Sequence, residues 1–449
     1  MPIRSSVLAM AACLSAALLV GCADGGSSAT RAAGAVPVTP QGTTSGAQGS
    51  AARSVHSGVR RTLSVPTCSG TGVGAFLGGA GGNGGQGDNP NVAAGQFSVV
   101  GGGSGNQGCD SWSSIAGGYD NAVSGSGEDG FIGAGEYNVV TGSENDSDSV
   151  VVGGSGNQVS NSDSAIVGGQ SNTVSIDNGF LGGGINNIVS GEYGAIAGGL
   201  HNTVSGEGAY IAAGGYNTAS GEGALVDGGF NSTANGNFAT IPGGYANSAG
   251  GTYSFAAGAR ASAAQTGTFV WSDGSDGDTI LTSERAYQFV ARASGGVTFW
   301  TNAASTVGAA LAPGSGTWAS ASDRNLKTDV AQLDDAAVLA KVAALPIERW
   351  SYKSERGVRH VGPMAQDFYA AFGVGEDDKH ITSIDEDGVA LAAIKALHAE
   401  NGALHTRVSV LDAENAQLRA ASASQSAKIT AIQAQLQRLS AQMAALHAR

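Results

Sequence analysis

The sequence predicts a mostly β fibre, built from β-roll or parallel β-helix coils, followed by a small α+β domain and a C-terminal coiled coil. Two observations lead to this fold class. A Gly- and Asn-rich pattern repeats between residues 79 and 262, and a heptad pattern without a break fills residues 394–449. A third observation, a short polar motif at residues 322–327, lies where the fibre part gives way to the helical part.

Residues 1–21 predict a secretory signal. Arg4 supplies a positive charge, and the apolar run from Val7 to Val20 is too short and too rich in Ala and Ser to span a membrane. The run closes on Leu-Val-Gly-Cys at residues 19–22, which resembles the bacterial lipobox. The resemblance implies that Cys22 carries a lipid that anchors the protein to a membrane. Ala23 follows in place of the Asp associated with inner-membrane retention in enterobacteria, which favours the outer membrane and the cell surface. An ordinary signal peptide with an incidental cysteine is the alternative.

Residues 22–78 predict a flexible tether. Up to about Val65 the segment is rich in Ala, Gly, Ser, Thr and Gln, so it buries too little apolar surface to offset the cost of ordering. Cys68 follows, and its one candidate partner outside the signal and the lipid site is Cys109. A disulfide between the two and a pair of free thiols both remain open, because the sequence does not show whether they are close.

Residues 79–262 contain the repeat. In each unit an aliphatic triplet precedes a pair of small residues, usually Gly-Gly, and then an Asn; five of these asparagines are spaced by 15 residues, namely Asn157, Asn172, Asn187, Asn202 and Asn217. This period is too short for a helical solenoid and suits a coil of two short strands and two Gly-rich turns. We expect the central aliphatic residue to face inward, Gly to occupy positions with φ > 0, and the asparagines to form a ladder. Such coils have almost no core of their own, so stacking and trimerisation must supply the burial.

These repeats resemble the head repeats of trimeric autotransporter adhesins and, more closely, the Gly-Gly-x-x-Asn arrays of bacterial tail-fibre-like proteins. The resemblance implies a homotrimeric fibre and says almost nothing about which ligand the fibre binds. No amphipathic strands follow the coiled coil, so we expect the lipid on Cys22 to replace the autotransporter anchor. A calcium-binding nonapeptide roll needs Asp in nearly every turn, where this chain mostly has Asn. An ice-binding face needs regular Thr-x-Thr ranks, which are missing.

Charge restricts the partners of the fibre. Residues 66–262 include 15 acidic residues and a single basic one, Arg260, and the whole chain has a net charge of −14. A surface this acidic repels nucleic acid and anionic membranes. We interpret the charge as a means of keeping an extracellular fibre soluble, with an acidic receptor-binding face as the alternative. The 7 His residues show no paired ligand spacing, so no metal and no cofactor are expected.

Residues 263–321 predict a β-rich neck. Three short β-prone runs, at 269–271, 287–291 and 296–300, are separated by turn residues. We expect the chains of the trimer to intertwine here, with the aromatic side chains in the core between chains rather than on a sugar-binding platform.

Residues 322–393 resemble the intramolecular chaperone domain of phage endosialidases and tail spikes, a family of self-cleaving serine peptidases. Three features carry the resemblance: Ser-Asp-Arg at 322–324 with a lysine at 327, Gly-Pro-Met-Ala-Gln-Asp at 362–367, and the helix-opening run at 388–394. The acid after the Gln is Asp where Glu is commoner in the family. The resemblance implies supporting roles for Asp323, Arg324, Gly362, Gln366 and Asp367.

The family cuts itself just before the serine, which here implies cleavage between Ala321 and Ser322. A serine hydroxyl needs a base to become a nucleophile, and Lys327 is the candidate. Ser322 attacks the carbonyl carbon before it, giving an ester that water opens. If the later motifs were absent, Ser322 would more simply be the N-cap of a helix.

Residues 394–449 predict the coiled coil. Asn at two a positions specifies register at some cost in stability, and a Ser and a Gln mark a weak middle layer. Heptads alone do not choose three strands over two. The a positions are Ile394, Asn401, Val408, Asn415, Ser422, Ile429, Leu436 and Met443, and the d positions are Leu397, Leu404, Leu411, Leu418, Gln425, Ile432, Leu439 and Leu446.

Taken together, these features predict a lipid-anchored homotrimeric surface fibre, an adhesin for an unnamed receptor or glycan, that is assembled by its C-terminal domain. One self-cut is the only enzymatic activity expected. A tail-spike-like glycan-degrading fibre and a purely structural fibre are the alternatives. Glycan hydrolysis needs a pair of carboxylates on a rigid surface, and no such pair stands out in the repeats.

Overall fold

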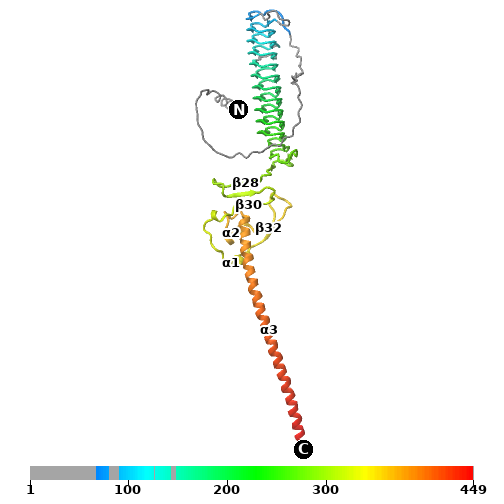
Figure 1. Cartoon of the computed structure of the whole chain (residues 1–449), viewed down its shortest axis with the longest axis vertical. Helices are drawn as coiled ribbons and strands as arrows, with labels where there is room; N and C mark the ends of the chain where they lie inside the picture. The colour runs from blue at the N-terminus through cyan, green and yellow to red at the C-terminus, as the bar shows by residue number, and fades with distance from the viewer. Residues whose placement is uncertain (1–66, 80–89, 126, 143–147, 448–449) are drawn as a thin grey trace, which may run out of the picture. The chain divides into compact units, whose positions relative to one another are not determined.

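The computed structural model describes residues 67–79, 90–125, 127–142 and 148–447 (Figure 1). The signal segment, the lipidation site at Cys22 and nearly all of the predicted tether lie outside the described residues. The described part consists of a β-solenoid, a three-stranded antiparallel sheet, and a C-terminal region with a β-hairpin and helices. The predicted β-roll is therefore present as a solenoid.

The solenoid has two parallel sheets, of 14 and 13 strands. The first sheet contains β1 (Phe76–Leu77), β3 (Val99–Val100), β5 (Ser114–Ile115), β7 (Phe131–Ile132), β9 (Val150–Val151), β11 (Ala165–Ile166), β13 (Phe180–Leu181), β15 (Ala195–Ile196), β17 (Tyr210–Ile211), β19 (Leu225–Val226), β21 (Thr240–Ile241), β23 (Phe255–Gly258), β25 (Phe269–Ser272) and β27 (Phe289–Arg292). The second contains β2 (Val92–Ala93), β4 (Gln107–Gly108), β6 (Ala122–Val123), β8 (Val139–Thr141), β10 (Gln158–Ser160), β12 (Thr173–Val174), β14 (Ile188–Val189), β16 (Thr203–Val204), β18 (Thr218–Ala219), β20 (Thr233–Ala234), β22 (Ser248–Ala249), β24 (Ala261–Ala263) and β26 (Leu281–Thr282).

Each coil gives one strand to each sheet, and the core lies between the two sheets. In the regular part, a residue pairs with the residue 15 positions later, as Ala195 does with Tyr210. Ile166 and Ile196 point inward from the first sheet, Val174 and Val204 point inward from the second, and none of the four has exposed surface. The inward direction predicted for the central aliphatic residue is therefore confirmed.

The predicted asparagine ladder is also present. Asn172 donates from its backbone N–H to Oδ1 of Asn157 (3.1 Å), and its Nδ2 donates to the carbonyl oxygens of Gly168 (3.1 Å) and Gly184 (3.0 Å). Asn157 and Asn172 are fully buried. Each amide thus satisfies backbone groups at a corner where the chain turns too tightly to pair with itself. Ser232 takes the place of Asn in one coil.

The sheets do not end at residue 262, where the sequence placed the boundary of the repeats. Strands β25 and β27 continue the first sheet, with Phe255, Phe269 and Phe289 in register and their rings stacked. Two of the three runs assigned to an intertwined neck are therefore solenoid strands of a single chain. The third, β28 (Val297–Trp300), forms the antiparallel sheet with β29 (Gly308–Leu311) and β30 (Trp318–Ser320).

Cys68 and Cys109 form a disulfide, with an S–S distance of 2.06 Å. It joins the chain ahead of β1 to the residue that follows β4, 41 positions later. The disulfide therefore cross-links the N-terminal end of the solenoid, where the first strand of each sheet pairs with a neighbour on one side only.

The C-terminal region contains the 3₁₀ turn η1 (Arg324–Leu326), the hairpin strands β31 (Glu348–Trp350) and β32 (His360–Gly362), and helices α1 (Asp335–Ala344), α2 (Ala365–Phe372) and α3 (Ser383–His447). Helix α1 packs against the start of α3, where Ala392, Ala393 and Ala396 are buried. Lys395 of α3 pairs with Asp335 at 2.6 Å. Among the described residues, no helix combines the length and apolar character needed to cross a membrane.

Candidate functional site

The serine and the lysine of the 322–327 motif lie in direct contact. Nζ of Lys327 donates a hydrogen bond to Oγ of Ser322 at 2.7 Å, although five positions separate the residues. Both side chains are exposed in the single chain. The arrangement places an amine at hydrogen-bond distance from a hydroxyl, as nucleophile activation requires.

The turn η1 brings these two side chains together. Oδ1 of Asp323 accepts hydrogen bonds from the backbone N–H of Asn325 (2.9 Å) and from its Nδ2 (3.0 Å), so Asp323 is the N-cap of the turn. The backbone N–H of Lys327 then donates to the carbonyl of Arg324 (3.2 Å). One 3₁₀ turn reverses the chain enough for Lys327 to reach back to Ser322. Asp323 thus positions the pair by capping, and Arg324 contributes backbone from within the turn.

The bond expected to be cut follows directly on regular structure. Strand β30 ends at Ser320, and the N–H of Ala321 donates to the carbonyl of Gly308 at 3.1 Å. The residue on the N-terminal side of the Ala321–Ser322 bond is therefore tied to the three-stranded sheet, while the residue on its C-terminal side begins the turn.

The second motif lies on the hairpin and α2. Gly362 ends β32, where a Cβ would lie 4.0 Å from the indole nitrogen of Trp350, and Gln366 and Asp367 are in the first turn of α2. Within residues 322–447, no hydrogen bond or ion pair links any of these three to Ser322 or Lys327. In one chain, the structure therefore joins the serine and the lysine but does not connect the second motif to them.

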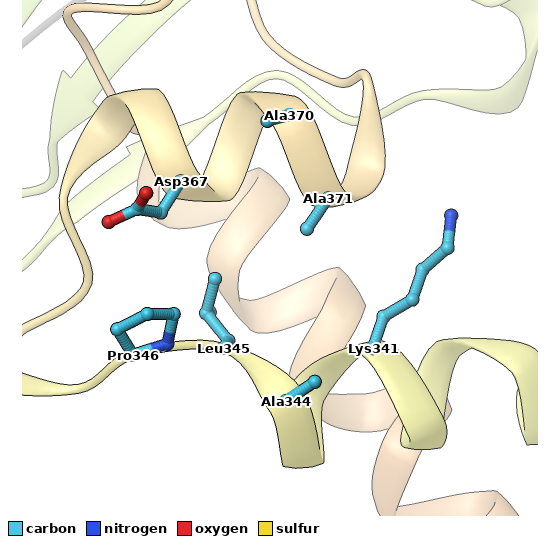
Figure 2. A pocket seen from close by; sticks show the side chains of 7 residues that line it. All are labelled: Lys341, Ala344, Leu345, Pro346, Asp367, Ala370 and Ala371. Carbon is cyan, nitrogen blue, oxygen red and sulfur yellow. The ribbon is translucent and has the colours of Figure 1, made fainter.

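Asp367 borders a shallow, open pocket between α1 and α2 (Figure 2). Lys341 lies at the other end of the pocket, and the two charged groups point away from each other. The floor between them is made by small and apolar side chains of Ala344, Leu345, Pro346, Ala370 and Ala371. Because a single aliphatic floor offers no convergent polar groups, we assign this pocket to packing rather than to chemistry.

The ion pair between Lys395 and Asp335 is a feature that sequence reasoning missed. It fastens α1 to α3 across 60 positions, and neither residue belongs to a motif. Only the packing of the two helices brings these charges together, so no local signal in the sequence marks them.

No part of the chain that the structure describes covers the predicted a and d residues of α3 from Leu404 onward. Leu404, Leu411 and Leu418 are each about half exposed or more, and they follow one another at heptad spacing along a helix of 65 residues. An apolar stripe of this length, open to water, favours packing against another apolar stripe. Among the described residues, no group of His, Cys, Asp and Glu is arranged to hold a metal ion.

A search of curated proteins finds no match to the chain. The comparison with protein families does find one, and it begins at the serine of the site. Residues 322–374 match the family Chaperone of endosialidase (Peptidase_S74). A β-solenoid followed by this autoproteolytic type of chaperone domain fits a tail-fibre-like protein, and the match includes Ser322, Lys327, the hairpin and α2.

Proposed function

We propose that this chain is a trimeric surface fibre, lipid-anchored through Cys22 and adhesive, whose C-terminal domain directs assembly and is then released by self-cleavage between Ala321 and Ser322. The observation that carries the proposal is the 2.7 Å contact between Nζ of Lys327 and Oγ of Ser322, at the first residue of the family match. The long solenoid supplies the fibre, and the uncovered stripe of α3 supplies the surface for three-stranded assembly.

The cut proceeds as an acyl transfer within the backbone. Neutral Nζ of Lys327 accepts the proton of the Ser322 hydroxyl while Oγ attacks the carbonyl carbon of Ala321. The C–N bond breaks, an ester joins Ala321 to Oγ, and the proton moves to the amine of Ser322, which becomes a free N-terminus. Water then opens the ester, which leaves a carboxylate on Ala321 and restores the hydroxyl.

Assembly must precede this chemistry. A lysine amine surrounded by water is protonated at neutral pH and has no lone pair to accept a proton. Ser322, Lys327 and the residues between them are all exposed in the single chain. In the proposed trimer, three chains pack around the site and remove this water, which is the condition under which an amine acts as a base. The trimer is therefore the active form, and each chain cuts once.

The experiment compares self-cleavage in four versions of the full chain on denaturing gels, with N-terminal sequencing of the smaller fragment. The wild type yields a fragment that begins at Ser322. Ser322→Ala and Lys327→Ala stay full length yet assemble, because either loss disables the pair as a unit. Lys353→Ala, an exposed lysine of the same domain, cleaves like the wild type. Cleavage of Lys327→Ala at the wild-type rate, or a fragment that begins elsewhere, contradicts the proposal.

Anchoring is tested separately. Cells that express the wild type or Cys22→Ser are labelled with a fatty-acid analogue and fractionated. Label and membrane association depend on Cys22, because burial of acyl chains is the anchor. Equal label in the two proteins rules the lipid anchor out and leaves the self-cleavage proposal untouched.

A further inference from the structure

The outward surface of the 14-stranded sheet is apolar and almost free of charge. We call it face A: the residues that immediately precede and follow the buried residue of each odd-numbered strand from β3 to β21. Phe131, Val152, Val167 and Phe180 on this face are each 37–49% exposed. Among the face A positions, all of which the structure describes, Asp227 is the one charged residue. An apolar face that continues over ten coils of an acidic protein marks a contact surface.

The other side of the solenoid has the opposite character. The outward positions of the 13-stranded sheet are rich in Thr and Ser, as at Thr203 and Ser205. At the turns that follow this sheet, four acids recur at 15-residue spacing, one to a coil: Asp177, Glu192, Glu207 and Glu222. If identical chains met there, each of the four acids would lie against the acids of its neighbours. On face A, identical chains would bring together the copies of a single acid, Asp227, so this repulsion is much smaller.

The glycine pair beside face A supports close approach by another molecule. The second glycine of the pair is needed by its own chain: Gly199 has φ +107°, and a Cβ there would lie 2.3 Å from the carbonyl oxygen of Gly214. The chain's own fold does not require a glycine at the first position of the pair at Gly168 or Gly198. A Cβ at either residue would meet nothing within 4 Å, and neither residue has a positive φ. Where this position is not Gly in β3 to β21, it is Ala, at Ala134 and Ala213. Of the first glycines in β3 to β21, Gly243 is the one with a positive φ (+146°); at the others, the described residues show no cause for the lack of side chains at this edge.

From these observations we infer that face A, with its glycine edge, packs against another copy of this chain in parallel register. The inference rests on the trimer of the proposed function and assigns its interface within the fibre. Ten strands at about 4.8 Å spacing make a face about 43 Å long. A partner that contacts it throughout must be straight and repeat at the same spacing, as a second copy does. With a width of about 15 Å, the face offers on the order of 650 Å² per chain, close to what a stable interface buries.

Thiol labelling of the full chain tests this assignment. Cys13 and Cys22 are replaced by Ser, and Cys68 and Cys109 are bridged, so one introduced thiol reacts. Val167→Cys and Ala197→Cys place it on face A, and the matched controls Ser175→Cys and Ser205→Cys place it on the opposite sheet. All four positions are exposed in the single chain. We expect face A thiols in the trimer to react at least ten-fold more slowly than the controls, and all four to react alike in urea.

Sedimentation of the same samples distinguishes a wrong interface from a wrong oligomeric state. A trimer whose four thiols react at equal rates overturns the assignment of face A and leaves the trimer intact, with the face open to a ligand such as a glycan. A monomer with equal rates overturns the trimer and the assignment together. Gly198→Val adds a second measurement: it fills space that is empty within the chain, so it lowers the thermal midpoint of trimer dissociation, whereas Ser205→Val does not.

Discussion

At the scale of single residues, the asparagine ladder shows what the repeat predicted and what it did not. The 15-residue spacing of the asparagines predicted a ladder, because equivalent residues of stacked coils lie one above another. The sequence did not predict which backbone groups accept hydrogen bonds from the side-chain amides. The carbonyl oxygens of Gly168 and Gly184 lie near Nδ2 of Asn172 only because of the geometry of the turns. The two glycines of each pair also look alike in sequence. In the coils of β3 to β21 the second always has a positive φ, whereas among the first glycines Gly243 alone has one.

Ser232 leaves a gap in this ladder, and filling it stabilises the fibre. In the preceding coil, Nδ2 of Asn217 donates to the carbonyl oxygens of Ala213 (3.3 Å) and Gly229 (3.0 Å). Ser232 is fully buried, and its shorter side chain donates to neither of the equivalent oxygens. Ser232→Asn therefore raises the free energy of unfolding by about 1 kcal/mol per chain, and Asn217→Ser lowers it by a similar amount. Urea unfolding of both variants checks this, and a loss of stability in Ser232→Asn contradicts it.

Asp110 makes the stability of the solenoid depend on pH. The side chain is buried beside the disulfide, and burial raises its pKa to about 6, although a hydrogen bond from the backbone of Gly125 opposes the rise. A raised carboxyl pKa means that the native state holds the proton more tightly than the unfolded chain. The ionised form is therefore destabilising above about pH 6, and the penalty fades as the pH falls toward 4.

Asp110→Asn removes this penalty while keeping the shape and an acceptor for Gly125. We expect the variant to be roughly 1–3 kcal/mol more stable than the wild type at pH 8 and equal to it at pH 4. Thermal unfolding at the two pH values measures the difference. The same difference at both values would show that charge at Asp110 is not its cause.

At the scale of elements, the strands with a strict period were predictable and those that lose it were not. Strand β25 follows β23 by 14 positions and β27 follows β25 by 20, counted between their first residues, so the 15-residue signal disappears although the coils continue. The extra residues form a loop held by Arg260, which pairs with Asp278 at 2.6 Å. The contact between Ser322 and Lys327 was predictable, because five positions and one turn separate them. The contact of α1 with α3 was not, because it is tertiary.

Helix α3 supplies the element-scale prediction. Val410 and Leu411 are neighbours of similar exposure, 53% and 48%, but Leu411 occupies a d position and Val410 a c position. Only a and d side chains are buried in a coiled coil. Leu411→Asp therefore dissociates the trimer before cleavage, because it places three carboxylates in one core layer, whereas Val410→Asp leaves it assembled. Sedimentation in a Ser322→Ala background, where the domain stays attached, compares the two. Equal behaviour would contradict the heptad assignment.

At the scale of the whole molecule, the repeats create a problem of register for the proposed trimer, and we propose that the C-terminal domain solves it. The coils between β9 and β21 are nearly alike, so chains that slip by one coil bury almost the same face A and form competing states. Parallel pairing of this kind is also slow, since it joins chains without local contacts. In the proposed function, the predicted coiled coil and the domain at 322–393 bring three chains together at one end and in one alignment before the coils of the solenoid pair.

This role predicts that the chain ending at Ala321 behaves differently according to whether it was made by cleavage of the full-length protein or expressed from a shortened gene. A fibre made as the full-length protein and then cut after Ala321 stays a soluble trimer, because face A and the coils are already packed in register. The same sequence, expressed from a gene that stops at Ala321, gives monomer or aggregate, since nothing sets the register while it folds. Analytical ultracentrifugation of the two preparations at equal concentration decides the matter. A soluble trimer from the shortened gene would show that the solenoid assembles without help, and the domain would then serve some purpose other than assembly.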